Sequence, residues 1–220
     1  MKALVTGANR GIGAALLDAL AAQGYAPTGT SRGAASDTML TADMSDPASI
    51  AALGTAWGKT PLDLLVCNAG VLLDRAEPLD TGYPSDMWAN SFAVNVTGVF
   101  LTVQAFLPAL RRAADQQGEA KIAIISSQLG SQTIASGGLY IYRASKAAAL
   151  SIGRNLAQDL AAENIHVGIY HPGWVQSDMG GERADITVSQ SATGLATRFA
   201  ALSSKSTGVF ETWDGTPHPY

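Results

Sequence analysis

The chain has 220 residues, a length at which one hydrophobic core is usual, so we expect a single domain over residues 1–220. Its net charge of −4 gives no reason to expect a nucleic-acid partner. Only 15% of the residues are charged, against about 25% in a typical globular protein, which leaves room for self-association as a homodimer.

The composition also bears on compartment and metal content. The single cysteine, Cys67, excludes an internal disulfide framework and suits a reducing compartment, so we expect a cytoplasmic protein. The N-terminal residues run directly into a strand, and we expect no cleavable signal. No apolar run approaches the length needed to span a bilayer, so no membrane partner is expected. The three histidines have no metal-ligand spacing with Cys67, so no metal site is expected.

Strands and helices alternate along the chain. Short apolar runs predict strands at residues 3–5, 25–30, 39–44, 62–66, 121–125, 165–170 and 208–211. Helical spacing and composition predict helices at 14–23, 47–57, 85–114 and 186–202, and another that carries Tyr142 and Lys146 and ends near residue 163. Asp46 followed by Pro47 predicts the N-cap and the first position of the second helix.

The first strand leads into a glycine-rich turn, Thr6-Gly7-Ala8-Asn9-Arg10-Gly11-Ile12-Gly13, and then into a helix. Glycines let the backbone approach a ligand, and a helix N-terminus supplies unpaired N–H groups for a pyrophosphate. The spacing G-x-x-x-G-x-G differs from the common G-x-G-x-x-G pattern. A plain tight turn is the alternative, but the position after the first strand of an alternating chain favours nucleotide binding.

The second strand ends in Thr30-Ser31-Arg32, without the carboxylate that holds the ribose hydroxyls of NAD in dinucleotide folds. An arginine at this place suits the 2′-phosphate of NADP through paired hydrogen bonds. The sequence therefore favours NADP(H) over NAD(H), with Arg10 as a second candidate for the phosphate. The alternative is that Arg32 is an ordinary solvated loop residue.

The strand at 121–125 is followed by Ser126-Ser127, and Tyr142 and Lys146 then share one face of a helix, being four residues apart. A free tyrosine titrates at about pH 10, and a nearby ammonium group favours the phenolate. We therefore expect Lys146 to lower the pKa of Tyr142, with Ser127 holding a substrate oxygen. The alternative is a helix with an exposed lysine and a half-buried tyrosine. Ser126 is the weaker candidate for the serine role.

Two further stretches place polar groups in apolar surroundings. Small residues, Cys67-Asn68-Ala69-Gly70, end the strand at 62–66 and leave room for a ligand across the sheet edge. Asn95 lies on the apolar face of the helix at 85–114, where a buried amide needs partners for both its donor and its acceptor. Taken alone, Asn95 is a structural hydrogen-bonding residue.

With these residues in place, the chain resembles the short-chain dehydrogenase/reductase family over nearly its whole length. The turn at 6–13 resembles the cofactor loop of the family, and Asn68-Ala69-Gly70 resembles its N-A-G motif. Its catalytic tetrad is matched in order by Asn95, Ser127, Tyr142 and Lys146, and its P-G loop by Pro172-Gly173 and Ser177. Residues 172–181 are similar to the sniffer and C-factor group of carbonyl reductase-like proteins.

The resemblance implies a single-domain α/β Rossmann fold with a doubly wound parallel sheet of about seven strands. It implies NADPH-dependent reduction of a ketone or aldehyde to an alcohol by hydride transfer. Tyr142 would be the acid/base and Ser127 would position the carbonyl. Lys146 would lower the pKa of Tyr142 and bind the nicotinamide ribose, and Asn95 would hold a water in a proton relay to Lys146. The implied cofactor-binding residues are Gly7, Asn9, Arg10, Gly11, Ile12, Gly13, Ser31, Arg32, Asp43, Met44, Asn68, Ala69, Gly70, Tyr142, Lys146, Pro172, Gly173, Val175 and Ser177.

Mostly apolar residues at 72–84, 128–129 and 174–183 are expected to line the pocket, which favours a small hydrophobic carbonyl or alcohol substrate. Two departures from the family concern this region: the interval from Ser127 to Tyr142 is long, and Ser177 stands where threonine is usual. We do not expect an extended sugar-nucleotide epimerase, because too few residues follow Lys146 for its substrate domain. The rival function is a dinucleotide-binding signalling or sensor protein of the C-factor type with low turnover.

Overall fold

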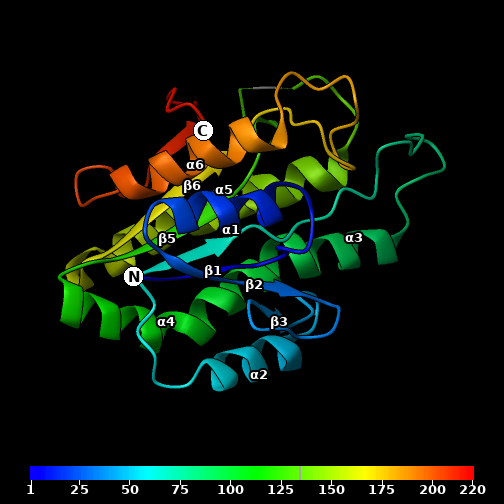
Figure 1. Ribbon diagram of the computed structural model, residues 1–220. Coiled ribbons are helices and arrows are strands. Elements are labelled where there is room, and N and C mark those ends of the chain that lie inside the picture. Colours follow the sequence, from blue (N-terminus) through cyan, green and yellow to red (C-terminus); the bar gives the residue numbers. More distant parts are fainter. Residues whose placement is uncertain (134) are drawn as a thin grey trace.

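The computed structural model describes residues 1–133 and 135–220. Its centre is a seven-stranded parallel sheet in the order β3-β2-β1-β4-β5-β6-β7 (Figure 1). The strands are β1 (Lys2–Val5), β2 (Ala26–Ser31), β3 (Met39–Thr41), β4 (Leu64–Cys67), β5 (Ala120–Ile125), β6 (Ile165–His171) and β7 (Phe210–Thr212). The helices are α1 (Gly11–Ala22), α2 (Pro47–Trp57), α3 (Ser85–Phe92), α4 (Gly98–Gln117), α5 (Tyr140–Leu160) and α6 (Val188–Ala201). The predicted doubly wound parallel sheet of about seven strands is confirmed.

The strand order locates the place where a ligand can bind. Strands β2 and β3 follow β1 in order toward one edge of the sheet. Strand β4 then lies on the other side of β1, and β5, β6 and β7 continue from it toward the opposite edge. The direction of winding therefore reverses between β1 and β4. In open α/β sheets this reversal leaves a crevice at the carboxyl ends of the strands, because the connections leave in opposite directions.

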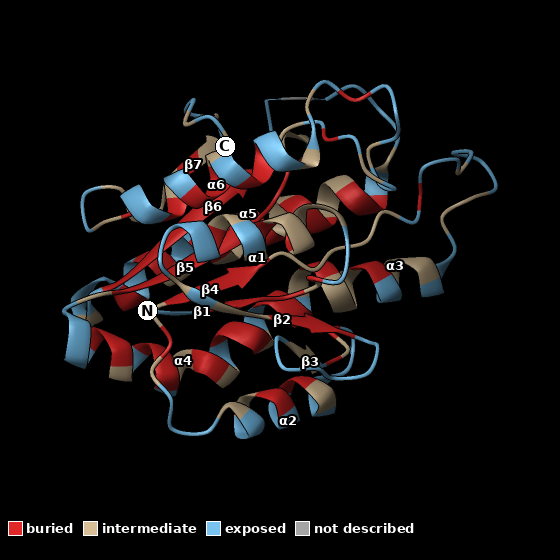
Figure 2. Cartoon of the chain, in the orientation of Figure 1, coloured by how far each residue is buried: buried red, intermediate tan, exposed pale blue. Residues whose placement is uncertain are grey.

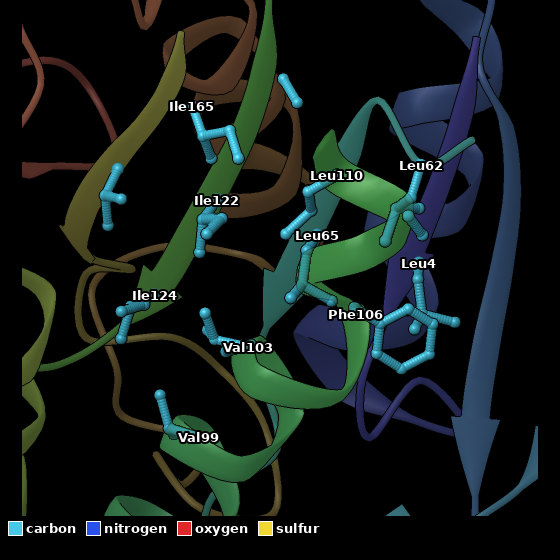
Figure 3. Packing of buried hydrophobic residues seen from close by; sticks show 14 of the residues in the cluster. Leu4, Leu62, Leu65, Val99, Val103, Phe106, Leu110, Ile122, Ile124 and Ile165 are labelled. Atoms are coloured by element: carbon cyan, nitrogen blue, oxygen red, sulfur yellow. The ribbon is translucent and has the colours of Figure 1, made fainter. Parts of the chain in front are cut away.

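The inner strands β4, β5 and β6 are buried on both faces, whereas the edge strands β3 and β7 are only partly buried, and the core forms two layers (Figure 2). Leu4, Leu65 and Ile122 point to the face covered by α2, α4 and α5, where Val103, Phe106 and Leu110 of α4 pack against them (Figure 3). The alternate strand residues form the second layer with α1 and α6, which lie side by side (Figure 1). Buried faces on both sides account for the nearly continuous apolar runs of β4 and β5.

The helix predicted at 85–114 is present but is not uniform. It consists of α3, a π-helical turn η1 (Ala93–Thr97) and α4. At the start of α4, Gly98 approaches the backbone so closely that an added Cβ would lie 2.2 Å from the carbonyl oxygen of Met44. The π turn, which carries Asn95, is the kind of distortion often found at functional sites. Other boundaries move by a few residues: α1 already starts at Gly11, and β3 ends at Thr41.

The expectation that no apolar run is long enough to span a bilayer is wrong. The continuous helical segment Ser85–Gln117 reaches that length, with a mean hydropathy of 1.6 over its most apolar window. In the structure this segment covers one face of the sheet, and residues such as Phe106 and Leu110 are completely buried in the core. Packing against the sheet therefore explains the apolar character of the helix. The length and hydropathy of this one helix are only weak evidence for a membrane span.

Candidate active site

The glycine-rich turn between β1 and α1 forms an open backbone cradle. Gly7 and Gly11 adopt φ values of +65° and +54°, a left-handed conformation that side chains disfavour. At Gly13 an added Cβ would lie 2.2 Å from the carbonyl oxygen of Gly7, so only glycine allows this approach. Arg10 precedes α1 and makes no side-chain cap bond, which leaves the first-turn N–H groups available. The cradle therefore fits a pyrophosphate.

The Asn68-Ala69-Gly70 stretch at the end of β4 holds this cradle in shape. The Asn68 side-chain amide donates to the carbonyl oxygens of Thr6 and Gly7, at 2.9 and 3.0 Å. The backbone N–H groups of Asn68 and Ala69 both donate to the Thr6 hydroxyl at 3.0 Å. Of the predicted cofactor residues, Asn68 thus braces the turn, and its direct contact with a ligand stays a prediction.

The residues predicted to select the cofactor lie on the exposed surface around the ends of β2 and β3. Ser45 donates hydrogen bonds that lower the pKa of Asp43, and the positive charge of Arg32 adds to this lowering. Arg32 therefore lies near the carboxylate of Asp43. Arg10 instead forms an ion pair with Asp178 at 2.6 Å, with side chains 71% and 76% exposed. Met44, by contrast, is buried beneath α4, where its sulfur contacts a threonine hydroxyl.

The predicted P-G loop follows β6 and is held by α6 and by its own turn. The Pro172 carbonyl accepts a hydrogen bond from a serine hydroxyl of α6 at 2.6 Å. Gly173 packs so tightly that an added Cβ would lie 2.5 Å from the side chain of Ile186, and Val175 pairs with Ile186 as an isolated β-bridge. The Ser177 hydroxyl donates to the carbonyl oxygen of Val175 at 3.2 Å. Ser177 is thus engaged in a local turn within this loop.

The predicted catalytic side chains meet where β5 ends beside the first turns of α5. Ser127 lies close enough to Tyr142 for its hydroxyl to lower the pKa of the phenol. The Lys146 ammonium nitrogen lies 5.7 Å from the centroid of the Tyr142 ring and donates to the carbonyl oxygen of Ile125 at 2.9 Å. The Ser126 hydroxyl donates to the main-chain carbonyl of Lys146 at 2.9 Å, so it anchors the helix. The geometry therefore brings Ser127, rather than Ser126, to Tyr142.

The pKa of Tyr142 is raised rather than lowered in the folded chain, and the expected contribution of Lys146 to it stays a prediction. Burial raises the pKa of Tyr142, while the hydrogen bond with Ser127 and the charge of Arg75 act in the opposite direction. Burial also lowers the pKa of Lys146 to about 8, since the ammonium group is taken out of water. A tyrosine that keeps its proton at neutral pH is suited to act as a proton donor.

Asn95 is fully engaged in hydrogen bonds from the π-helical turn. Its carbonyl oxygen accepts from the N–H of Val71 at 2.8 Å, and its amide group donates to the Val71 carbonyl at 2.9 Å and to the Ser145 hydroxyl at 3.0 Å. An added Cβ at Gly70 would lie 3.3 Å from both the Asn95 carbonyl oxygen and the Lys146 nitrogen. Gly70 thus keeps open the space between the two side chains, and the predicted water relay stays a prediction.

The two longer loops predicted to line the pocket lie at the same end of the sheet, at the right of Figure 1. A guanidinium N–H of Arg75 on the first loop donates to the carbonyl oxygen of Met179 on the second. Exposed large apolar side chains on these loops are Leu73, Leu79, Trp174 and Met179. Two surface hollows lie elsewhere, one between α2 and α4 and one beside α5 and the C-terminal residues, and neither is lined by Tyr142.

Sequence reasoning missed two residues of this region, Asp74 and Arg75, which it placed in an irregular loop. The Asp74 carboxylate accepts hydrogen bonds from the backbone N–H groups of Ile141 and Tyr142. The charge of Arg75 acts on the phenol of Tyr142. No local signal marks either residue, because their partners lie more than sixty positions away along the chain.

Comparison with known proteins places this geometry in a family. The family description of short chain dehydrogenases matches residues 1–186. The C-signal protein of Myxococcus xanthus is 35% identical over 161 residues, which cover 73% of this chain and 93% of that protein. The structure of NADPH-bound carbonyl reductase from chicken fatty liver has a TM-score of 0.90 and 31% identity, covering 100% of this chain and 98% of that one. Carbonyl reductase Sniffer of D. melanogaster has a TM-score of 0.91 and 27% identity, covering 100% of this chain and 99% of that one.

These matches agree with the motifs read from the sequence. The family description covers most of the chain, and both solved structures extend over all of it. The predicted resemblance to the sniffer and C-factor group is confirmed by the Sniffer structure and by the C-signal protein. The predicted class of enzyme is confirmed as well. The chain belongs to the short-chain dehydrogenase/reductase family.

Proposed function

We propose that this protein is an NADPH-dependent oxidoreductase that reduces a ketone or aldehyde to an alcohol. The observation that carries the proposal is the meeting of Ser127, Tyr142 and Lys146 at the end of β5, on the edge of the sheet where β1 leads into the glycine cradle. Similar structures that are named as carbonyl reductases, one of them bound to NADPH, support the same reaction class.

The side chains divide the work of proton handling. Bound NADPH would supply the hydride, as the cofactor carries this chemistry. The Ser127 hydroxyl holds the substrate carbonyl oxygen by a hydrogen bond, and Tyr142 donates the proton to that oxygen as it becomes a hydroxyl. Burial raises the pKa of the phenol, so it carries the proton that it donates near neutral pH. Lys146 binds the nicotinamide ribose, and Asn95 keeps the neighbouring loop in place through Val71.

The cofactor would be held along the crevice above β1 and β4. The cradle at residues 7–13 takes the pyrophosphate on its N–H groups, and Arg32 takes the 2′-phosphate of NADP. Arg32 is exposed and lies near Asp43, so its guanidinium can turn toward a phosphate at small cost. The apolar side chains on the loops at 72–84 and 174–183 favour a hydrophobic carbonyl substrate.

The test of the reaction is NADPH oxidation with a panel of small ketones and aldehydes, compared between wild type and Tyr142→Phe. Loss of the acid should reduce kcat/KM by at least about a hundredfold, because general-acid catalysis contributes on that scale. Binding of NADPH, followed by its fluorescence, should change little. Turnover close to wild type in the variant would refute the role of Tyr142. A wild-type protein that binds NADPH but reduces no carbonyl would instead favour the signalling function.

Cofactor choice is tested separately by titrating NADPH and NADH with wild type and Arg32→Ala. Charge-assisted hydrogen bonds contribute roughly 1.5–3 kcal/mol, so the NADPH dissociation constant should rise about ten- to a hundredfold while that of NADH changes little. Added salt should weaken NADPH binding more than NADH binding. Arg111→Ala, which removes an exposed arginine of α4 that pairs with Glu163, is the matched control. Equal affinities of wild type for both cofactors would make Arg32 an ordinary surface residue.

A further inference from the structure

The helix that carries Tyr142 starts without a cap of its own. Leu139, the residue before α5, has a φ of +52° and makes no side-chain hydrogen bond to the first turn. The first N–H groups of any helix lack partners within the helix and need acceptors from elsewhere. For α5 that acceptor comes from Asp74, 67 residues away from Ile141 in the chain.

The carboxylate of Asp74 is built into the start of the helix. Its Oδ2 accepts from the N–H of Ile141 at 2.8 Å and from the N–H of Tyr142 at 3.3 Å. The residue is only 1% exposed, and among the described residues no hydrogen-bond donor reaches its other oxygen, Oδ1. Burial of a carboxylate is costly unless it is paired or hydrogen-bonded. The positive end of the helix dipole and the two N–H groups supply that compensation.

We propose that Asp74 is a positioning residue of the reaction: it caps the catalytic helix from the neighbouring loop and thereby holds the Tyr142 phenol in place against Ser127. The proposal rests on the proposed role of Tyr142 as proton donor. A direct bond to the backbone of Tyr142 itself, rather than to a remote turn, links the cap to the phenol. The next residue, Arg75, bonds the carbonyl of Met179, so one dipeptide joins the catalytic helix to the loop at 174–183.

Asp74 also belongs to the set of groups that act on the Tyr142 proton. From the preceding strand end, Ser127 lowers the pKa of Tyr142 through its hydrogen bond. From the loop at 72–84, Arg75 lowers it and Asp74 raises it through their charges. Lys146 lies over the ring from the same helix. The charge of Asp74 also acts on Tyr83, at the far end of the loop.

Two substitutions separate the cap from the charge. Asparagine is as good a cap as aspartate because its carbonyl oxygen accepts the same hydrogen bonds, whereas alanine cannot cap. Asp74→Asn thus removes only the charge, and Asp74→Ala removes both. Asp46→Ala is the matched control, since Asp46 caps α2 through the N–H of Ala48 at 2.9 Å and lies outside the catalytic group.

The measurements are the pH profile of kcat for carbonyl reduction, the NADPH dissociation constant by fluorescence, and the thermal unfolding midpoint. With Asp74→Ala, we expect kcat to fall by about ten- to a hundredfold, the scale for a misplaced catalytic group, while NADPH affinity changes less than about twofold. With Asp74→Asn, kcat at the optimum pH should be close to that of wild type. Reduction requires the protonated phenol, and removal of the negative charge lowers its pKa, so the alkaline limb should move to lower pH by at least about 0.5 unit.

The results can fail in distinguishable ways. If wild type reduces carbonyls and depends on Tyr142, but Asp74→Asn leaves the alkaline limb in place, the assignment of Asp74 is refuted. The positioning role of Asp74 would also be refuted if Asp74→Ala and Asp46→Ala had the same unfolding midpoint and lost the same fraction of kcat. The loss of kcat would then follow from lower stability and not from a displaced Tyr142. If Asp74→Ala does not fold, the profile of Asp74→Asn decides. If Tyr142→Phe retains wild-type turnover, the proposed function fails first.

Discussion

Replacement of Lys146 by methionine should make the protein more stable. Lys146 is 5% exposed, and burial lowers its pKa from 10.5 to about 8. Each pH unit of such a shift corresponds to about 1.4 kcal/mol, so the buried ammonium costs about 3 kcal/mol at neutral pH. Its hydrogen bond to the carbonyl of Ile125 returns about 1 kcal/mol. Lys146→Met should therefore raise the free energy of unfolding by about 2 kcal/mol near pH 7 while abolishing activity.

The pH dependence of this gain has a definite sign. Between about pH 8 and 10.5 the unfolded chain keeps a proton on Lys146 that the folded chain has released. Folding stability therefore rises with pH through this window, and the cost of the ammonium is complete below pH 8 and absent above 10.5. The advantage of Lys146→Met over wild type should accordingly shrink as the pH rises.

The assay is urea unfolding followed by tryptophan fluorescence, without cofactor, at about pH 7 and about pH 9.5. The difference between the free energies of unfolding of the two proteins at each pH removes the contributions of other titrating groups. Lys205→Met is the control, because Lys205 is exposed and its loss should change stability by less than about 0.5 kcal/mol. A Lys146→Met protein that is less stable than wild type at neutral pH, with an unchanged pH dependence, would refute the reasoning.

Two other substitutions test the surroundings of the site. Gly13→Ala should lower the free energy of unfolding by about 1–3 kcal/mol and weaken cofactor binding, because a Cβ would lie 2.2 Å from the Gly7 carbonyl oxygen and 2.6 Å from the Asn68 amide nitrogen. Calorimetry measures the first effect and cofactor titration the second. Normal cofactor affinity in this variant would contradict the proposed pyrophosphate cradle. Asn95→Ala should cost about 2–4 kcal/mol, since it leaves the N–H and carbonyl of Val71 without their partner; a loss below about 1 kcal/mol in urea unfolding would show that Val71 finds other partners.

Local patterns in the sequence were sufficient for most of the fold. Apolar runs located the strands within a few residues, most clearly β4 and β5, which are buried on both faces and almost entirely apolar. Asp46 and Pro47 located the start of α2, where the Asp46 carboxylate does accept the predicted cap bond. The approximate places of Tyr142 and Lys146 on one helix face followed from their spacing alone.

Features that depend on distant neighbours could not be read in this way. The π-helical turn around Asn95 was not predicted, because the apolar residues at 85–114 indicated one uniform helix. The apolar length of Ser85–Gln117 could arise from a lipid or a protein environment, and only the packing of α4 on the sheet distinguishes the two. Likewise, the ion pair of Arg10 with Asp178 was not predicted, because the two residues are far apart in the chain.

The sequence by itself determined the alternation of strands and helices, the glycine turn and the spacing of the candidate catalytic residues Tyr142 and Lys146, because these depend on neighbours within a few positions. Only the tertiary structure decided the electrostatics of the site. The pKa of Tyr142 is raised because the folded chain removes the phenol from water, and Asp74 and Arg75 reach it from another loop. Desolvation and long-range charge pairing arise from packing, so spacing along the chain predicts which groups meet but not the proton affinity that they acquire.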